Sequence, residues 1–185
     1  NMSLNSYVTA DNLEIGRAQA VQAEACGIGC LVEMNPILLK PNDDLTSQVV
    51  LNGKPAGNKT ASEYFNEAGR DTLFIEVMHS FNRLAGHYNP IVIEGAGSIT
   101  EVNLWDKDIV NMRVALHTQA ATFLVADIDR GGVFASVYGT LQLLPQAERD
   151  AIKGIVINKF RGDLKLFEEG KKILEKLTAK PVVGI

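Results

Sequence analysis

The chain has 185 residues, of which 46% are hydrophobic and 22% charged, a composition typical of one soluble globular domain spanning residues 1–185. Eighteen basic and 22 acidic residues give a net charge of −4, which argues against a nucleic-acid partner. The longest apolar runs are too short to cross a membrane, and residues 1–10 lack the basic start and apolar stretch of a signal peptide. A cytoplasmic protein is therefore expected.

The first third of the chain mixes one helical pattern with two strand-like runs. Residues 11–26 form an Ala- and Gln-rich stretch that predicts a helix, and residues 35–41 and 47–53 are apolar runs separated by a polar turn. Residues 62–87 follow with apolar side chains close to helical spacing. We expect the part before this last helix to be an addition to the main sheet.

The remainder alternates buried strands with helices. Helical patterns cover residues 132–144 and 163–177, with Asp163 as the predicted N-cap of the second. Continuous apolarity, which indicates strands covered on both faces, marks four runs: 90–94, 121–127, 154–158 and 181–185. This order predicts an α/β fold with an open, mostly parallel sheet flanked by helices.

Polar or glycine-rich segments follow three of these apolar runs. They are residues 94–98, 127–132 and 158–161. Ligands of open α/β sheets bind beyond the carboxyl ends of the strands, so these three segments predict a common site.

The first segment combines an acid with glycines. Glu94 stands at the end of an apolar run. In many ATP enzymes an acid in this position holds Mg²⁺ against the nucleotide phosphates. Gly95 and Gly97 let the backbone approach a ligand closely. A tight turn with a solvated glutamate is an equally good interpretation of this motif alone.

The other two segments carry charges and an amide. Asp127, Asp129 and Arg130 precede Gly131 at the start of a predicted helix, where backbone amides favour anions and an arginine can neutralise a phosphate or a carboxylate. An Asp–Arg pair that only stabilises the loop is the alternative. Asn158 can contact the edge of a purine base through its amide, or it can cap a turn.

Five blocks of the sequence resemble the N-terminal synthetase region of cobyric acid synthases, in the family's order and spacing. The first two are specific to that family, and the motifs around Glu94 and Asn158 are shared with dethiobiotin synthetases and cobyrinic acid a,c-diamide synthases. The blocks are EIGRAQAVQA (14–23), MNPILLKP (34–41), VIEGAGS (92–98), ADIDRGGVFA (126–135) and VINKFRGD (156–163). The resemblance implies a P-loop NTPase fold of the dethiobiotin-synthetase type.

The resemblance also implies a reaction. Members of the family use ATP and Mg²⁺ to activate peripheral carboxylates of a corrin, adenosylcobyrinic acid a,c-diamide, and ammonia from a glutamine amidotransferase domain then forms the amide. By motif, Glu94 would bind the metal and Asn158 the adenine, with Gly95, Gly97 and Gly131 beside the nucleotide. Asp127, Asp129 and Arg130 would act at the phosphates and the substrate carboxylate. The residues that would line the corrin side are Gln19, Asn35 and Lys40.

One family motif does not occur in the chain. The phosphate-binding pattern G-x-x-x-x-G-K-[ST] is absent from the 185 residues. Together with the resemblance, the missing motif predicts that the chain is an internal piece of the synthetase domain, without the first strand, the phosphate loop and the amidotransferase domain. Such a piece is expected to be inactive alone. It is also expected to form homo-oligomers through an open sheet edge. The alternatives are a related ATP-dependent ligase, a regulatory ATPase of the same superfamily and a non-catalytic corrin-binding module.

Overall fold

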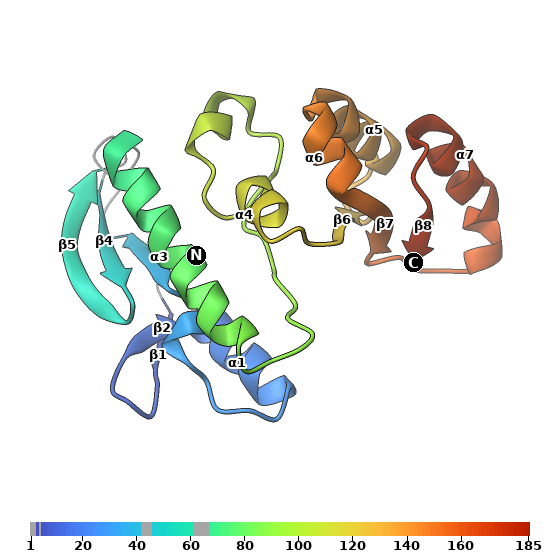
Figure 1. The fold of residues 1–185 in the computed structure, drawn as a ribbon. Helices are drawn as coiled ribbons and strands as arrows, with labels where there is room; N and C mark the ends of the chain where they lie inside the picture. Colours follow the sequence, from blue (N-terminus) through green and yellow to red (C-terminus); the bar gives the residue numbers. More distant parts are fainter. Residues whose placement is uncertain (1–2, 4, 42–45, 61–66) are drawn as a thin grey trace. The chain divides into compact units, whose positions relative to one another are not determined.

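The computed structural model describes residues 3, 5–41, 46–60 and 67–185, which divide into two compact units (Figure 1). The first unit is Asn1–Ala96 and the second is Gly97–Ile185, and each is described by itself. The single domain expected over residues 1–185 stays a prediction. No helix among the described residues has the length and apolarity needed to cross a membrane.

A short antiparallel ribbon and a helix open the first unit. Strand β1 (Ser6–Val8) pairs with β2 (Glu14–Gly16), and helix α1 (Arg17–Ala25) follows directly. The helix begins at residue 17 and not, as predicted, at residue 11, because residues 14–16 are extended and pair with β1. The buried Ala20 and Ala23 form its inner face.

An antiparallel sheet completes the first unit. Strands β3 (Ile37–Pro41), β4 (Thr46–Leu51) and β5 (Lys54–Thr60) lie in this order, after the 3-10 turn η1 (Val32–Met34). Asn52 and Gly53, with φ of +48° and +78°, form the two-residue turn between β4 and β5, as Asn-Gly turns of antiparallel hairpins do. Helix α3 (Glu67–Ala85) runs beside this sheet and buries Leu73, Phe74 and Met78 (Figure 1). Residues 62–66 of its predicted range lie outside the described residues.

The second unit contains the predicted parallel sheet. Strands β6 (Thr122–Asp127), β7 (Ile152–Asn158) and β8 (Val182–Gly184) are parallel, with β7 in the centre. Helices α5 (Val133–Leu143) and α7 (Glu168–Thr178) connect them and pack against each other. The α/β prediction is therefore confirmed. Sequence reasoning missed the short helical elements η2 (Val102–Lys107), α4 (Met112–His117) and α6 (Gln146–Ala151).

One face of the parallel sheet forms the core of the second unit. Leu141 of α5, Ile155 of β7 and Leu174 of α7 are at most 1% exposed within it. On β6 the side chains alternate, so that Phe123 and Val125 lie on the other face with 50% and 60% of their surface exposed. Only one of the two faces is therefore covered by the helices α5 and α7.

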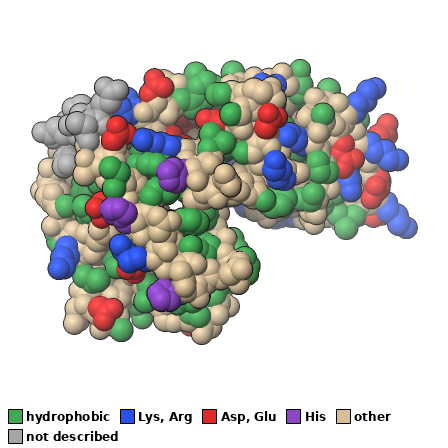
Figure 2. All heavy atoms as spheres, viewed as in Figure 1, with side chains coloured by type: hydrophobic (Ala, Val, Ile, Leu, Met, Phe, Trp, Pro, Cys, Tyr) green, Lys and Arg blue, Asp and Glu red, His purple; other side chains and the backbone are tan. Residues whose placement is uncertain are grey.

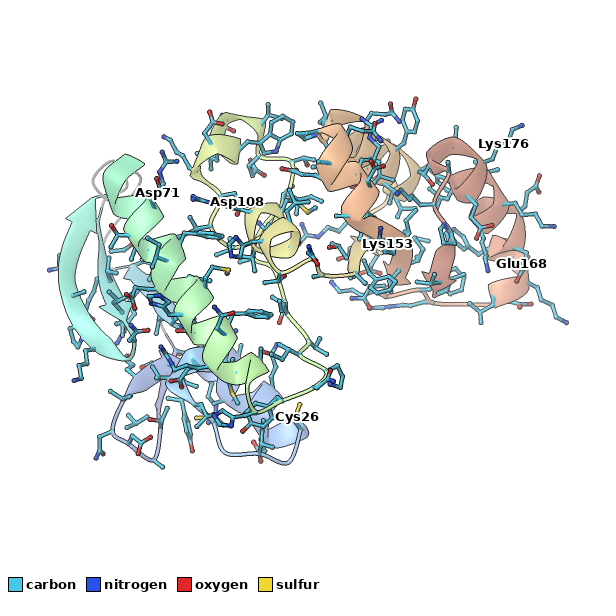
Figure 3. The ribbon with its side chains drawn as sticks, viewed as in Figure 1. Cys26, Asp71, Asp108, Lys153, Glu168 and Lys176 are labelled. Carbon is cyan, nitrogen blue, oxygen red and sulfur yellow. The ribbon has the colours of Figure 1, made fainter. Side chains whose placement is uncertain are left out.

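Charged side chains concentrate on α7. Its first turn contains Glu168 and Glu169 and its last turn Lys176, the distribution that the helix dipole favours (Figure 3). Figure 2 shows both signs of charge interspersed over this end of the second unit.

The predicted cap is present: Asp163 Oδ1 accepts a hydrogen bond from the backbone N–H of Lys165, 2.9 Å away, at the 3-10 turn η3 (Leu164–Phe167) that leads into α7.

The strand predicted at residues 90–94 is wrong. The chain there has no regular secondary structure, and Val92 is 93% exposed. Apolar β-branched residues favour a strand only where a neighbouring strand supplies hydrogen bonds. Among the described residues this segment pairs with no strand.

Candidate functional site

Glu94, the predicted magnesium ligand, is held by helix α1 of the first unit. It is exposed, and its Oε2 accepts a hydrogen bond from Gln22 Nε2. An exposed carboxylate fits Mg²⁺, which typically takes one or two protein carboxylates and completes its shell with phosphate and water oxygens. No group of three or more His, Cys, Asp or Glu side chains suited to a metal occurs in the described part of the chain.

Asn35, predicted to line the corrin, is engaged in the fold. Only 6% of the residue is exposed. Its Oδ1 accepts from the backbone N–H of Gly16 at 2.8 Å, and its Nδ2 donates to the carbonyl oxygen of Ile37 at 2.8 Å. The amide thus links the residue before α1 to the first residue of β3. Its contact with a corrin stays a prediction, and such a contact would have to share or replace these bonds.

Lys40 and Gln19, the other predicted corrin residues, lie on different elements of the same unit. Lys40 Nζ on β3 forms an ion pair with Glu14 Oε1 on β2 at 2.7 Å, with both side chains partly buried. The hydrogen bond from Lys40 is the main cause that lowers the pKa of Glu14 below its ordinary value, and a bond from Ser6 adds to it. Gln19 lies half-buried on α1. Like Asn35, Lys40 therefore contributes to the first unit's own structure.

The second unit brings together the residues that follow β6 and β7. Asp127 and Asn158 are partners in the parallel register, so the two strand ends lie side by side. Asp127 Oδ2 lies 2.7 Å from Lys159 Nζ and 3.6 Å from Arg130 Nε, and its Oδ1 accepts from the backbone N–H of Asp129 at 3.0 Å. The bond from Lys159 is the main cause that lowers the pKa of Asp127.

Asp129 is the more accessible of the two acids. Its side chain is 49% exposed, and Arg161 Nε lies 3.8 Å from its Oδ1. Lys159 and Arg161 lie within the segment 158–161 that the sequence predicted to follow a strand at the site, but neither was assigned a role from the sequence. Their position directly after Asn158 was the available signal, since parallel strand ends meet at one edge of the sheet.

The glycines at the start of α5 have the conformation expected of an anion-binding loop. Gly131 and Gly132 have φ of +75° and +69°, and no atom lies within 4 Å of the position of a Cβ at either. Gly132 is the N-cap of the 11-residue helix α5, so the first free amides of the helix follow it. These features fit a phosphate or a carboxylate placed against the loop.

The predicted residues therefore fall into two groups. Asp127, Asp129, Arg130, Gly131 and Asn158 lie together at the strand ends of the second unit. Gln19, Asn35, Lys40, Glu94 and Gly95 belong to the first unit, and Gly97, with φ of +68°, begins the second. Sequence reasoning missed Gln22, which contacts Glu94 across 72 positions of sequence.

Comparison with known proteins shows which proteins the chain is similar to. The chain is 63% identical over 185 residues to a protein from Bacteroides fragilis named cobyric acid synthase, covering 100% of this chain and 37% of that protein. Proteins of the same name from Phocaeicola vulgatus and Crocosphaera subtropica are 61% and 56% identical, again over 100% of this chain and 37% of each relative. The predicted resemblance is thereby confirmed.

The chain spans 37% of the length of these relatives, a little over a third. No solved structure matches it. The family model described as "AAA domain" matches residues 56–185, which include the whole parallel sheet and both strand ends. The chain belongs to the AAA domain family.

Proposed function

We propose that a protein of the relatives' length containing this chain acts in cobalamin biosynthesis as a cobyric acid synthase. It would amidate peripheral carboxylates of adenosylcobyrinic acid a,c-diamide with ATP, Mg²⁺ and ammonia from glutamine. The observation that carries the proposal is the identity of 52–63% to proteins of that name over the whole chain. The group at the ends of β6 and β7 supports it, because a ligase of this kind needs a nucleotide site beside a carboxylate site.

The residues of the second unit have distinct parts in this proposal. Asn158 would contact the adenine, and the amides after Gly131 would donate hydrogen bonds to phosphate oxygens. Arg130, whose side chain is 86% exposed, would neutralise charge on the phosphates or on the substrate carboxylate. Asp129 is the exposed acid that would orient the incoming ammonia.

The residues of the first unit would bind the metal and the substrate. Glu94 would hold Mg²⁺, which neutralises phosphate charge when bound, and Gly95 and Gly97 would allow the backbone to approach the nucleotide. Gln19 and Lys40 would donate hydrogen bonds to corrin carboxylates and amides, with Asn35 nearby in the fold. A cytoplasmic location follows from this metabolic role.

The 185-residue chain alone is proposed to be inactive. Its sequence contains no G-x-x-x-x-G-K-[ST] motif, whose amides and lysine supply most triphosphate contacts in P-loop enzymes. We further propose that it self-associates through the edge of β6 that no described strand covers. Light scattering should then give a mass above that of one chain, and a monomer at high concentration would contradict self-association.

A product assay tests the function. A protein of the relatives' length should convert the a,c-diamide corrin to more amidated products, followed by mass spectrometry, only when ATP, Mg²⁺ and glutamine or ammonia are all present. Glu94→Gln should raise the Mg²⁺ requirement, whereas Glu24→Gln on the exposed part of α1 should not. Amidation of unmodified cobyrinic acid instead would indicate an a,c-diamide synthase, and no corrin product would contradict the proposal.

A further inference from the structure

The loops that follow β6 and β7 are joined by more than the sheet ladder. The backbone N–H of Ile128 donates to the carbonyl oxygen of Asn158 at 3.2 Å. Two ion pairs cross between the same loops, Lys159 with Asp127 at 2.7 Å and Arg161 with Asp129 at 3.8 Å. Each pair joins a cation after β7 to an acid at the end of β6 or just beyond it, so the two strand ends are coupled at three points.

Lys159 has a backbone conformation that needs such support. Its φ is +61°, in the left-handed region that residues with a Cβ adopt at a cost. Its N–H donates to Asn158 Oδ1 at 2.9 Å, while its Nζ reaches Asp127 on the neighbouring strand. Unfavourable conformations of this kind persist where surrounding contacts maintain them. Lys159 therefore connects the orientation of the Asn158 amide directly to Asp127.

We propose that Lys159 is a positioning residue of the nucleotide site, and that Asp127 is its counter-ion and neither a metal ligand nor a catalytic acid. The ion pair holds the turn after β7 so that Asn158 presents its amide to the base. This inference rests on the proposed function, in which Asn158 contacts the adenine. It also assigns different roles to Asp127, the last residue of β6, and Asp129, which lies in the loop that follows.

Asp127 and Asp129 differ in what their oxygens already bind. Both oxygens of Asp127 are engaged, Oδ2 by Lys159 and Oδ1 by the N–H of Asp129, and its side chain is 27% exposed. Asp129 is 49% exposed, and its Oδ1 lies 3.8 Å from Arg161 Nε, a longer ion pair than that of Asp127 with Lys159. A ligand that approaches the loop can reach the Asp129 carboxylate without displacing a short ion pair. Asp127 would first have to lose Lys159.

The test measures ATP dissociation constants by titration calorimetry in a protein of the relatives' length. Lys159→Met and Asp127→Asn should each weaken ATP binding about tenfold, and the double variant should be no weaker than the weaker single variant, because both remove one interaction. Lys159→Arg should restore most of the affinity. Lys172→Met, at an exposed lysine of α7, is the matched control and should bind as the wild type does.

A second readout distinguishes positioning from a general loss of structure. The KM for the corrin and the thermal midpoint should stay near the wild-type values in Lys159→Met, while the KM for ATP rises. Unchanged ATP affinity in Lys159→Met, or losses that multiply in the double variant, would overturn the inference. Absence of ATP binding in the wild-type protein would overturn it as well. ATP binding without corrin amidation would refute the proposed function alone, because the ion-pair test depends only on the nucleotide.

Discussion

The polar residues compared in the two units differ in how far they are exposed and in what they contact. In the first unit Asn35 is 6% exposed with both ends of its amide bonded to backbone, and Lys40 pairs with a partly buried Glu14. In the second unit Arg130 and Arg161 are 86% and 80% exposed beside two acids at the strand ends. Asn35 and Lys40 therefore stabilise the first unit, whereas Arg130 and Arg161 remain accessible to ligands in the second.

The largest expected effect tests whether the units are independent. Leu38→Ala in the first unit and Leu174→Ala in the second each remove a side chain that is 0% exposed, which should cost about 2–5 kcal/mol of unfolding free energy. Each should reduce amide-exchange protection mainly within its own unit, as measured by hydrogen–deuterium exchange. Leu166→Ala, at an 85% exposed position, is the control. Equal loss of protection in both units would indicate one cooperative domain.

The next effect compares two glycines with left-handed backbone. At Gly53 an added Cβ would lie 2.5 Å from Leu13 Cβ and 3.0 Å from the backbone nitrogen of Glu14, whereas at Gly131 it would meet nothing within 4 Å. Gly53→Ala should therefore destabilise by about 2–4 kcal/mol, from backbone strain and the clash together. Gly131→Ala should cost about 1–2 kcal/mol, from strain alone. Urea unfolding of both variants measures the difference, and equal losses would contradict the close packing around Gly53.

Removal of the Asn35 amide should have a smaller effect. Asn35→Ala leaves the N–H of Gly16 and the carbonyl of Ile37 without their partner, which costs about 1–3 kcal/mol for buried groups. Asn82→Ala, at an exposed position of α3, should change the unfolding free energy by less than about 0.5 kcal/mol. Equal stability of the two variants would contradict a structural role for the Asn35 amide.

The smallest effect concerns acid pH. The folded-state pKa values of Glu14 and Asp127 are both lowered by a lysine, so each ion pair stabilises the protein fully above the ordinary carboxyl pKa. That stabilisation is lost as the pH falls through the lowered values. Lys40→Met should return the pKa of Glu14 toward its ordinary value in an NMR titration and cost at most about 1 kcal/mol above that pH range. An unchanged Glu14 titration would contradict the ion pair between Lys40 and Glu14.

The strands of the second unit were predictable, as were β3 and β4 of the first unit, whereas β1, β2 and β5 were not. Strands β6 and β7 coincide with the predicted apolar runs 121–127 and 154–158, which no helical spacing explains. By contrast, β1 and β2 have three residues each, too few to show a period, and β5 has the polar sequence KPAGNKT. The strand predicted at residues 90–94 was wrong because composition indicates only that a segment favours a strand. It does not indicate whether a neighbouring strand is present to pair with it.

Residues of the site were predictable by position but not by partnership. Asp127, Gly131 and Asn158 follow apolar runs, and that placement alone indicated the strand ends. The ion pair between Lys159 and Asp127 spans 32 positions, and the hydrogen bond from Gln22 to Glu94 spans 72. Such contacts depend on the register between neighbouring strands and on the direction in which a helix runs. Neither can be read from a single sequence.

The uninterrupted register between β6 and β7 limits how this gene can change in length. From Phe123 opposite Gly154 to Asp127 opposite Asn158 the pairing has no irregularity. Deletion of one codon within either stretch would turn the following side chains to the other face of the sheet and separate Asp127 from Lys159. Insertions between Leu144 and Gln146, ahead of β7, leave this pairing intact. Natural length variation should therefore concentrate in that turn and be rare within the two strands.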